Sequence, residues 1–278
     1  MLNELGVKLT RIAIFSNNGR SSNQVAAKLI KGVNRSSSLQ LNGLNPQIVI
    51  SIGGDGTLLS AFHHYNDSLD QIRFIGIHTG HLGFYTDWRD NEVGQLIEAL
   101  DNDNRQSVSY PLLSLKINYT DGGASDRILA LNESVIKRIS TTMVIDIYIK
   151  HQFIEKFRGD GLCVSTPTGS TAYNKSVGGA ILAPSLNAIQ VSEMASINNR
   201  VFRTLGSPMI IPTNEVVTVI PEGHYQNILT CDQMLVHNRP IRSVSYRISR
   251  HRIYFAKYRH THFWKRVSNS FIGMHPSD

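Results

Sequence analysis

The chain has 278 residues, nearly twice the ~150 residues of an average domain, so we expect two domains. Its composition of 41% hydrophobic and 18% charged residues excludes intrinsically disordered and collagen-like proteins, because the apolar residues are sufficient for packed cores. The formal net charge of +7 makes anionic substrates or partners the ones to consider.

Cysteine content and hydropathy indicate where the protein works. The two cysteines, Cys163 and Cys231, are too few for a disulfide framework and belong to no CxxC pair, so we expect buried, reduced thiols. No apolar signal-peptide core follows Met1, and no run of roughly 18 apolar residues is available to span a membrane. The sequence therefore predicts a cytoplasmic protein with no membrane partner.

Short apolar runs alternate with helical patterns up to about residue 105. The expected strands are 12–15, 48–50 and 74–77. The expected helices carry apolar residues at helical spacing over 25–33, 58–62 and 93–100, with Asp90 as the cap of the last one. Strands that alternate with helices indicate a parallel sheet covered on both faces. We therefore predict that residues 1–105 form an α/β domain with a parallel sheet.

After Pro111 the apolar residues recur at every second position. This alternation covers 113–119 and 143–149, and the triplet Asp121-Gly122-Gly123 supplies the residues of a tight hairpin turn. We predict that residues 106–258 form a β-rich, antiparallel, sandwich-like domain. Within residues 259–278, a short amphipathic segment at 263–272 is expected to pack back on the first domain.

Basic residues gather near the C-terminal end. No Asp or Glu lies between Gln233 and Ser277, and the nine basic residues there are Arg239, Arg242, Arg247, Arg250, Arg252, Lys257, Arg259, Lys265 and Arg266. A nucleic-acid surface is one interpretation, because such residues release counterions from phosphates. Residues 243–249, however, alternate polar and apolar, as a strand with one solvated face does. We favour a solvated face or a field that attracts small anions, and we predict no nucleic-acid partner.

The motif Gly53-Gly54-Asp55-Gly56-Thr57 lies between a predicted strand and a predicted helix. Glycines at such a junction let backbone N–H groups approach a phosphate, and the helix N-terminus adds partial positive charge. The alternative is a tight turn in which Asp55 only caps the helix. The motif is neither a Walker A loop nor GxGxxG.

Two further polar segments are candidates for binding. Asn132 and Glu133 follow a strand pattern at 127–131, where an amide and a carboxylate could chelate adjacent sugar hydroxyls, although a polar strand end is often only a turn. The segment from Arg158 to Ser176 holds so many hydroxyls and small residues that it suits a polar nucleotide better than a core. Its alternative is a flexible surface loop.

The eleven histidines show no metal-ligand spacing, and neither HExxH nor GxSxG occurs. We therefore assign no metal-ligating residues and expect the histidines to have packing or surface roles.

Together these motifs closely resemble those of the NAD kinases. The resemblance rests on GGDGT at 53–57, HTGHLGF at 78–84, Asn-Glu-Ser at 132–134, the GDG-to-TGSTAYN segment at 159–174 and EMASINNR at 193–200, and it covers nearly the whole chain. GGDGT alone is shared with lipid kinases and phosphofructokinases, whereas TGSTAYN and Asn-Glu in this order are typical of NAD kinases. The chain length and the residues of the motifs are similar to those of the shorter bacterial members of this family.

The resemblance implies a phosphotransferase. A member of this family transfers the terminal phosphoryl of ATP, or in some members of inorganic polyphosphate, to the 2′-hydroxyl of the adenosine ribose of NAD, and the product is NADP. Mg²⁺ is expected as cofactor, held largely by ATP. The resemblance also implies a homo-oligomer, a tetramer, in which some residues reach a neighbouring chain's dinucleotide.

The resemblance also assigns roles to residues. Asp55 is the proton acceptor for the 2′-hydroxyl. The residues around the donor phosphates are Gly53, Gly54, Gly56 and Thr57. The residues around NAD are Asp55, Gly56, Asn132, Glu133, Arg158, Asp160, Thr171, Ala172, Tyr173, Asn174, Lys175, Ser176, Ala195 and Gln233. Gln233 departs from the family pattern, because the usual Gly between it and the preceding Asp232 is absent.

Two alternatives belong to other classes. A lipid or sugar kinase shares the GGDGT loop but should lack the Asn-Glu and TGSTAYN elements. A non-enzymatic nucleotide sensor could dispense with Asp55.

Overall fold

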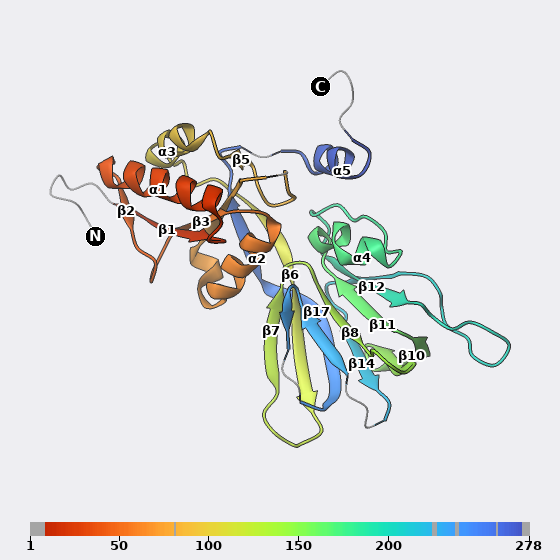
Figure 1. Ribbon diagram of the computed structural model, residues 1–278. Helices are drawn as coiled ribbons and strands as arrows, with labels where there is room; N and C mark the ends of the chain where they lie inside the picture. Colours follow the sequence, from red (N-terminus) through yellow and green to blue (C-terminus); the bar gives the residue numbers. More distant parts are fainter. Residues whose placement is uncertain (1–8, 81, 224–226, 237–238, 260, 274–278) are drawn as a thin grey trace. The chain divides into compact units, whose positions relative to one another are not determined.

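The computed structural model describes residues 9–273 except 81, 224–226, 237–238 and 260. The chain divides into two compact units (Figure 1). The first unit contains the residues up to Ser109 and those from Arg252 on, and the second contains Tyr110–His251. Among the described residues, no helix is both long and apolar enough to cross a bilayer.

The first unit is built on a parallel sheet with the strand order β2-β1-β3-β4-β5. The strands are β1 (Thr10–Ser16), β2 (Leu39–Leu41), β3 (Ile48–Ile52), β4 (Arg73–His78) and β5 (Trp88–Arg89). The end of β17 (Ile241–Ala256) also pairs parallel with β4, through Phe255 and Phe74. Every residue of β3 is buried, which is typical of a central strand covered on both faces.

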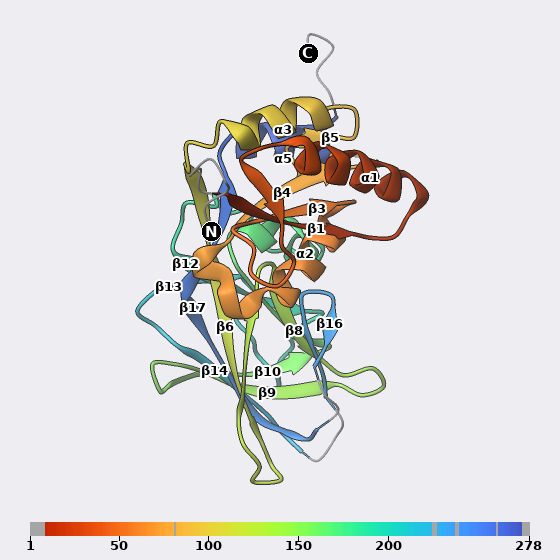
Figure 2. The same ribbon diagram turned by 90° about the vertical axis from the view of Figure 1, so that its left-hand side faces the viewer.

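Helices cover both faces of this sheet. They are α1 (Arg20–Arg35), α2 (Asp55–His64) and α3 (Val93–Asp101), with the 3₁₀ helix η1 (Asn66–Gln71) after α2. Figures 1 and 2 show α1 and α3 over one face and α2 under the other. Val25, Leu29 and Val33 form the buried stripe of α1, as their spacing of four predicts. The predicted α/β architecture is therefore confirmed.

The start of α3 differs from the prediction. Asp90 does not cap the helix: it is exposed in the preceding turn, and the N-cap residue is Glu92. The Glu92 carboxylate instead closes that turn, because it accepts a hydrogen bond from the Arg89 N–H at 2.8 Å and pairs with Arg259 at 2.6 Å.

The C-terminal helix α5 (Phe263–Phe271) packs on residues 83–87 of the first unit. Arg266 is only 4% exposed, donates to the carbonyl oxygens of Gly83 and Thr86 at 2.7 Å each, and pairs with Asp87. The ring of Phe84 lies against those of Phe263 and Phe271. This helix therefore holds the loop that follows β4.

Two antiparallel sheets form the second unit. The first has the order β10-β9-β14-β17 with β6 beside β17 and β7 beside β6, and the second has the order β13-β12-β11-β8-β15-β16. In the first sheet, besides β17, these are β6 (Ser107–Tyr119), β7 (Asp126–Ala130), β9 (Met143–Ile149), β10 (Gln152–Gly159) and β14 (Val217–Pro221). In the second they are β8 (Glu133–Lys137), β11 (Gly161–Ser165), β12 (Ala188–Met194), β13 (Met209–Pro212), β15 (Ile228–Cys231) and β16 (Met234–Leu235).

One hydrophobic core joins these two sheets. It includes Leu115 of β6 and Ile147 of β9 from the first sheet, and Ile136 of β8 and Val164 of β11 from the second. Two sheets that bury their facing side chains in one core form a sandwich, as the period-two alternation predicted.

Two local predictions in this unit were wrong. The connection at Asp121–Gly123 is no tight hairpin, because the β6–β7 ladder begins only at Ile117 and Asp126. The strand pattern at 127–131 also ends earlier than expected: β7 stops at Ala130, and Glu133 is the first residue of β8 rather than part of a strand end.

Candidate functional site

The GGDGT loop connects β3 to α2 in the first unit. A Cβ on Gly53 would lie 2.3 Å from Thr57 Oγ1 and 3.0 Å from Asn17 Nδ2, so only glycine fits there. The Thr57 N–H donates to the Gly54 carbonyl oxygen at 3.0 Å, which starts the helix, while Gly54 and Gly56 remain exposed. An exposed helix N-terminus with open glycine backbone is suited to an anion such as a phosphate.

Asp55 is fixed by two backbone amides. Its Oδ2 accepts a hydrogen bond from the Phe84 N–H at 2.8 Å, and its Oδ1 accepts one from the Tyr85 N–H at 3.0 Å. A Cβ on Gly83 would lie 2.2 Å from Asp55 Oδ1, so a side chain at this position would displace the carboxylate. Each carboxylate oxygen keeps a second lone pair, so Asp55 is oriented and still able to accept a proton or a further hydrogen bond.

These contacts explain part of the 78–84 motif. Phe84 supplies a backbone amide to Asp55, and its loop is in turn held by Arg266 of α5. Sequence reasoning missed Arg266, because one arginine among the nine C-terminal basic residues carries no local pattern that marks it. His81 of the motif lies outside the described residues.

In the second unit, Asp232 organises the Asn132–Glu133 turn. Its carboxylate accepts hydrogen bonds from the N–H groups of Leu131 at 3.0 Å, Asn132 at 2.7 Å and Glu133 at 3.2 Å. Thr166 braces the same turn, because its hydroxyl donates to the Leu131 carbonyl oxygen at 2.6 Å. Sequence analysis named Asp232 only as the neighbour of Gln233, and the three amides that it binds lie about 100 residues away.

Glu133 is a buried carboxyl group with an open oxygen. Its side chain is 8% exposed, and its Oε2 has no hydrogen-bond partner among the described residues. Burial and, to a smaller extent, the nearby Asp232 carboxylate together raise the pKa of Glu133 to about 8, against the opposing effect of the hydrogen bond from the Tyr173 N–H. The group is therefore mostly protonated at neutral pH, so it can donate one hydrogen bond and accept another.

The TGSTAYN segment packs directly against this turn. It forms the 3₁₀ helix η2 (Thr168–Thr171) and the short helix α4 (Tyr173–Ser176). Gly169 permits the contact, since a Cβ there would lie 2.0 Å from the Asn132 carbonyl oxygen. The structure thus brings Asn132, Glu133 and this segment together.

The side chains of the segment divide into two groups. Tyr173, Lys175 and Ser176 are exposed and Ala172 is half-buried, so all four are open to a ligand, whereas Thr171 is 8% exposed and donates to the Thr168 carbonyl oxygen. Asn174 is fully buried, and its amide oxygen accepts a hydrogen bond from Ser192 at 2.7 Å. Asn174 therefore holds α4 in place.

A second group of predicted residues lies at the ends of β10 and β12. The Ile197 N–H donates to the Arg158 carbonyl oxygen at 2.8 Å, and the Asp160 N–H donates to the Met194 carbonyl oxygen at 2.9 Å, next to Ala195. The Arg158 guanidinium lies 4.2 Å from the centroid of the Phe202 ring. Asp160 and Ala195 are exposed, and Ala195 has a φ of +47°.

The family of the chain follows from comparison with known proteins. Residues 14–104 match the model of the ATP-NAD kinase N-terminal domain, and residues 131–255 match that of the ATP-NAD kinase C-terminal domain. An NAD kinase of Levilactobacillus brevis is 62% identical over 263 residues, which cover 95% of this chain and 98% of that protein. The chain belongs to the NAD kinase family. It is therefore a kinase that phosphorylates NAD to NADP.

Other relatives agree. An NAD kinase of Enterococcus faecalis is 52% identical over 263 residues, covering 95% of this chain and 99% of that protein. Among solved structures, yeast NADH kinase complexed with NADH has a TM-score of 0.84 at 18% identity, covering 98% of this chain and 89% of that one. An NAD kinase from Archaeoglobus fulgidus in complex with ATP has a TM-score of 0.70 at 21% identity, covering 95% and 98%. At these identities the structural likeness concerns the fold.

The NAD kinase motifs of the second unit fall at two ends of one strand. In the register of β8, β11 and β12, Ser165 at one end of β11 is opposite Glu133, and Gly161 at the other end is opposite Met194. Four residues at a rise of ~3.3 Å each separate the two ends by roughly 13 Å. Glu133 and Asp160 therefore do not converge on one point within the chain. Gln233 is exposed beside Asp232, at the Glu133 end.

A carboxyl pair that sequence reasoning missed holds the chain after Ala195. Glu155 accepts a hydrogen bond from the Leu205 N–H at 2.7 Å, and Glu193 accepts one from the Gly206 N–H at 3.1 Å. Burial raises the pKa of Glu155 to about 7, and the neighbouring Glu193 carboxylate contributes to the increase. Because Phe202 lies against Arg158, this pair anchors the segment that orients the guanidinium.

Proposed function

We propose that this NAD kinase transfers the γ-phosphoryl of ATP to the 2′-hydroxyl of the adenosine ribose of NAD. The observation that carries the proposal is the buried Glu133 carboxyl, which has a hydrogen bond from the Tyr173 N–H and whose Oε2 has no partner among the described residues. An unpartnered polar atom is costly in a protein interior unless a ligand satisfies it. A ribose diol, which offers both donors and acceptors, matches a protonated carboxyl next to an amide.

In this proposal Asp55 receives the proton of the 2′-hydroxyl. The hydroxyl oxygen forms a bond to the γ-phosphorus, the bond from that phosphorus to the bridging β–γ oxygen breaks, and ADP leaves. A carboxylate with a reference pKa near 3.9 is a weak base for an alcohol, so proton transfer has to accompany formation of the oxygen–phosphorus bond. The two amides that hold Asp55 support this role, because they orient the carboxylate before the reaction.

The GGDGT loop would bind the donor phosphates. The exposed backbone of Gly54 and Gly56 at the start of α2 supports contacts to phosphate oxygens from the N–H groups. Mg²⁺ prefers oxygen ligands and usually reaches such sites with its phosphates, and the Asp55 carboxylate and the Thr57 hydroxyl are the side-chain oxygens of this loop. When bound, Mg²⁺ would neutralise charge on the transferred group. Inorganic polyphosphate is the alternative donor.

The separation of Glu133 from Asp160 supports a dinucleotide site shared between chains. Since these residues lie at opposite ends of β11, one chain would bind the adenosine half through its Glu133 end. A neighbouring chain would contribute Arg158, Asp160 and Ala195. A homotetramer in the cytoplasm is the assembly and location that we propose.

An NAD analogue that lacks the 2′-hydroxyl of the adenosine ribose tests this function. We expect the analogue to compete with NAD for binding and to yield no phosphorylated product when ATP is supplied. The product is detected with radiolabelled γ-phosphate. A phosphorylated analogue would contradict the proposed acceptor, and NAD itself, in parallel, establishes that the preparation is active.

A further inference from the structure

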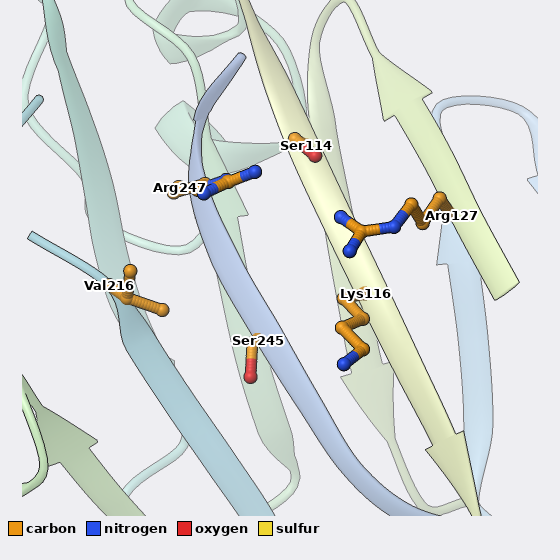
Figure 3. A pocket seen from close by; sticks show the side chains of 6 residues that line it. All are labelled: Ser114, Lys116, Arg127, Val216, Ser245 and Arg247. Atoms are coloured by element: carbon orange, nitrogen blue, oxygen red, sulfur yellow. The ribbon is translucent and has the colours of Figure 1, made fainter. Parts of the chain in front are cut away.

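A pocket of about 210 Å³ opens on the second unit and uses none of the residues assigned to NAD or ATP (Figure 3). We call it the three-cation pocket. Its lining residues come from β6, β7 and β17 and from the residue before β14: Ser114, Lys116, Arg127, Val216, Ser245 and Arg247. No carboxylate belongs to this lining. The pocket includes one member of the C-terminal basic cluster, Arg247, to which the proposed kinase reaction gives no role.

The strand register brings two of the three cations together, and the third lines the same pocket. Lys116 of β6 is directly opposite Arg127 of β7 in the antiparallel ladder. Figure 3 shows Arg127 extending from β7 over β6, and Arg247 extending from β17 toward Ser114. Like charges directly opposite each other on neighbouring strands repel and destabilise a sheet. Arg127 and Arg247 are exposed and Lys116 is half-buried, so solvent screens part of this repulsion, and an anion among the three side chains would relieve the rest.

The protein supplies no such anion within the described ranges. No ion pair or side-chain hydrogen bond joins Lys116, Arg127 or Arg247 to another described residue. The neighbouring carboxylates are engaged elsewhere. Asp126, next to Arg127, accepts a hydrogen bond from the Tyr119 hydroxyl at 2.6 Å, and Glu215, next to Val216, pairs with Lys150 at 3.0 Å.

The remaining lining groups suit an oxyanion. Ser114 and Ser245 offer hydroxyls that can donate to anionic oxygens, and the Ser245 hydroxyl is positioned by a 3.0 Å hydrogen bond with Thr218. Arginine presents a planar fork that matches phosphate oxygens, while lysine supplies a compact charge. The volume corresponds to about seven water molecules at ~30 Å³ each, below the ~300–1,000 Å³ typical of pockets for drug-sized ligands.

We propose that the three-cation pocket is a binding site for a short polyphosphate chain of two or three phosphates, outside the residues assigned to NAD and ATP. Three positive charges without a counter-charge select a multiply charged anion over a singly charged one. The limited volume selects a short chain over a whole dinucleotide. A free chain and the phosphate end of a nucleotide both fit this description, since both present the same oxygens.

Calorimetric titration with inorganic tripolyphosphate at constant ionic strength tests the proposal. We expect the affinity to fall about tenfold in Lys116→Ala and in Arg247→Ala, and to be retained in Lys116→Arg, which keeps the charge. The matched control is Arg242→Ala, because Arg242 is exposed on β17 and does not line the pocket. The midpoint temperature of thermal unfolding should be no lower in the pocket variants than in the control, since each pocket variant removes a repulsion between like charges.

The outcomes separate the alternatives. Equal tripolyphosphate affinity in all variants, or an equal loss in Arg242→Ala, would overturn the proposal. A variant-sensitive affinity for ADP above that for tripolyphosphate would support the site and assign it to nucleotides. Tighter variant-sensitive binding of an RNA oligomer would overturn the proposal in favour of a nucleic-acid surface. A smaller oligomer in the variants, without tripolyphosphate binding to the wild type, would overturn it in favour of a contact between copies.

Discussion

The protonation of Glu133 predicts a reversal in the effect of one substitution. Replacement of Glu133 by Gln removes a group whose pKa rises from 4.5 in the unfolded chain to about 8 in the folded protein. A raised carboxyl pKa means that the folded state binds the proton more tightly, so its stabilising contribution is complete below pH 4.5 and is lost as the pH rises to 8. Integrated between pH 5 and pH 8, the loss in the wild type is about 3–4 kcal/mol.

Glu133→Gln escapes this loss but has a cost that does not depend on pH. The amide nitrogen of Gln would occupy the buried position of Oε2, where no described residue accepts its hydrogen bonds, at a cost of about 1–3 kcal/mol. The two terms are similar in size. We therefore expect the variant to be less stable than the wild type at pH 5 and at least as stable at pH 8.

Urea unfolding at pH 5, 6, 7 and 8 measures the difference in unfolding free energy. Glu155, with a pKa raised to about 7 by burial and by Glu193, titrates in both proteins and cancels in the difference. Glu98→Gln makes the same chemical change on an exposed side chain and should alter the unfolding free energy by less than about 0.5 kcal/mol at each pH. A difference between variant and wild type that stays constant from pH 5 to pH 8 would refute the reasoning.

Three further predictions follow from the same contacts. Gly83→Ala should lower kcat at least about tenfold, because its Cβ would displace the Asp55 carboxylate, whereas Gly80→Ala, with no atom within 4 Å of the added Cβ, should leave kcat within about twofold; steady-state kinetics checks this, and equal effects would contradict it. Arg266→Met should destabilise the protein by about 3 kcal/mol, since Asp87 and two carbonyl oxygens lose a buried donor, and an unchanged midpoint of urea unfolding would count against this role. Mixed oligomers of Asp55→Asn and Arg158→Ala chains, verified by mass spectrometry, should exceed the mean activity of the two parents, and activity that stays flat at every mixing ratio would reject the shared site.

Local periodicity was sufficient for the architecture. The buried run of β3 and the alternation along β17, in which Val244, Tyr246 and Ile248 are buried, are set by residues next to one another in the chain. The motifs likewise indicated which segments come together, since Asn132, Glu133 and the TGSTAYN segment are in contact. Each of these predictions depends on information within a single segment.

Contacts between distant segments could not be predicted in this way. The bonds from three amides near Glu133 to Asp232 span about 100 residues, and those from Arg266 to the Gly83–Asp87 loop span about 180. The error at Asp90 has the same origin, because the turn before α3 is closed by Glu92 and Arg259, 167 residues apart. Such partners depend on tertiary packing, which hydrophobic spacing does not encode.

The buried state of Asn174 also depends on packing. In the sequence, Asn174 looks the same as an asparagine that binds a ligand. Only the structure reveals that the Ser192 hydroxyl of β12 donates a hydrogen bond to the side-chain amide oxygen of Asn174. Its direct contact with NAD stays a prediction. A substitution at Asn174 should therefore be read first through its effect on the position of α4.

The assignment of Asp55 is tested most directly by a coupled assay of the purified chain and its Asp55→Asn variant. NAD and ATP are supplied with Mg²⁺, and NADP is measured through an NADP-specific dehydrogenase. The wild type should form NADP, and Asp55→Asn should be slower by about 10²–10⁴, the usual contribution of a general base. Both oxygens of Asp55 accept hydrogen bonds from backbone N–H groups, so the substitution could also displace the loop. NAD affinity is therefore measured alongside, to distinguish a displaced loop from the loss of the base. Absence of NADP with the wild type, or near-normal turnover in Asp55→Asn at unchanged NAD affinity, would contradict the account.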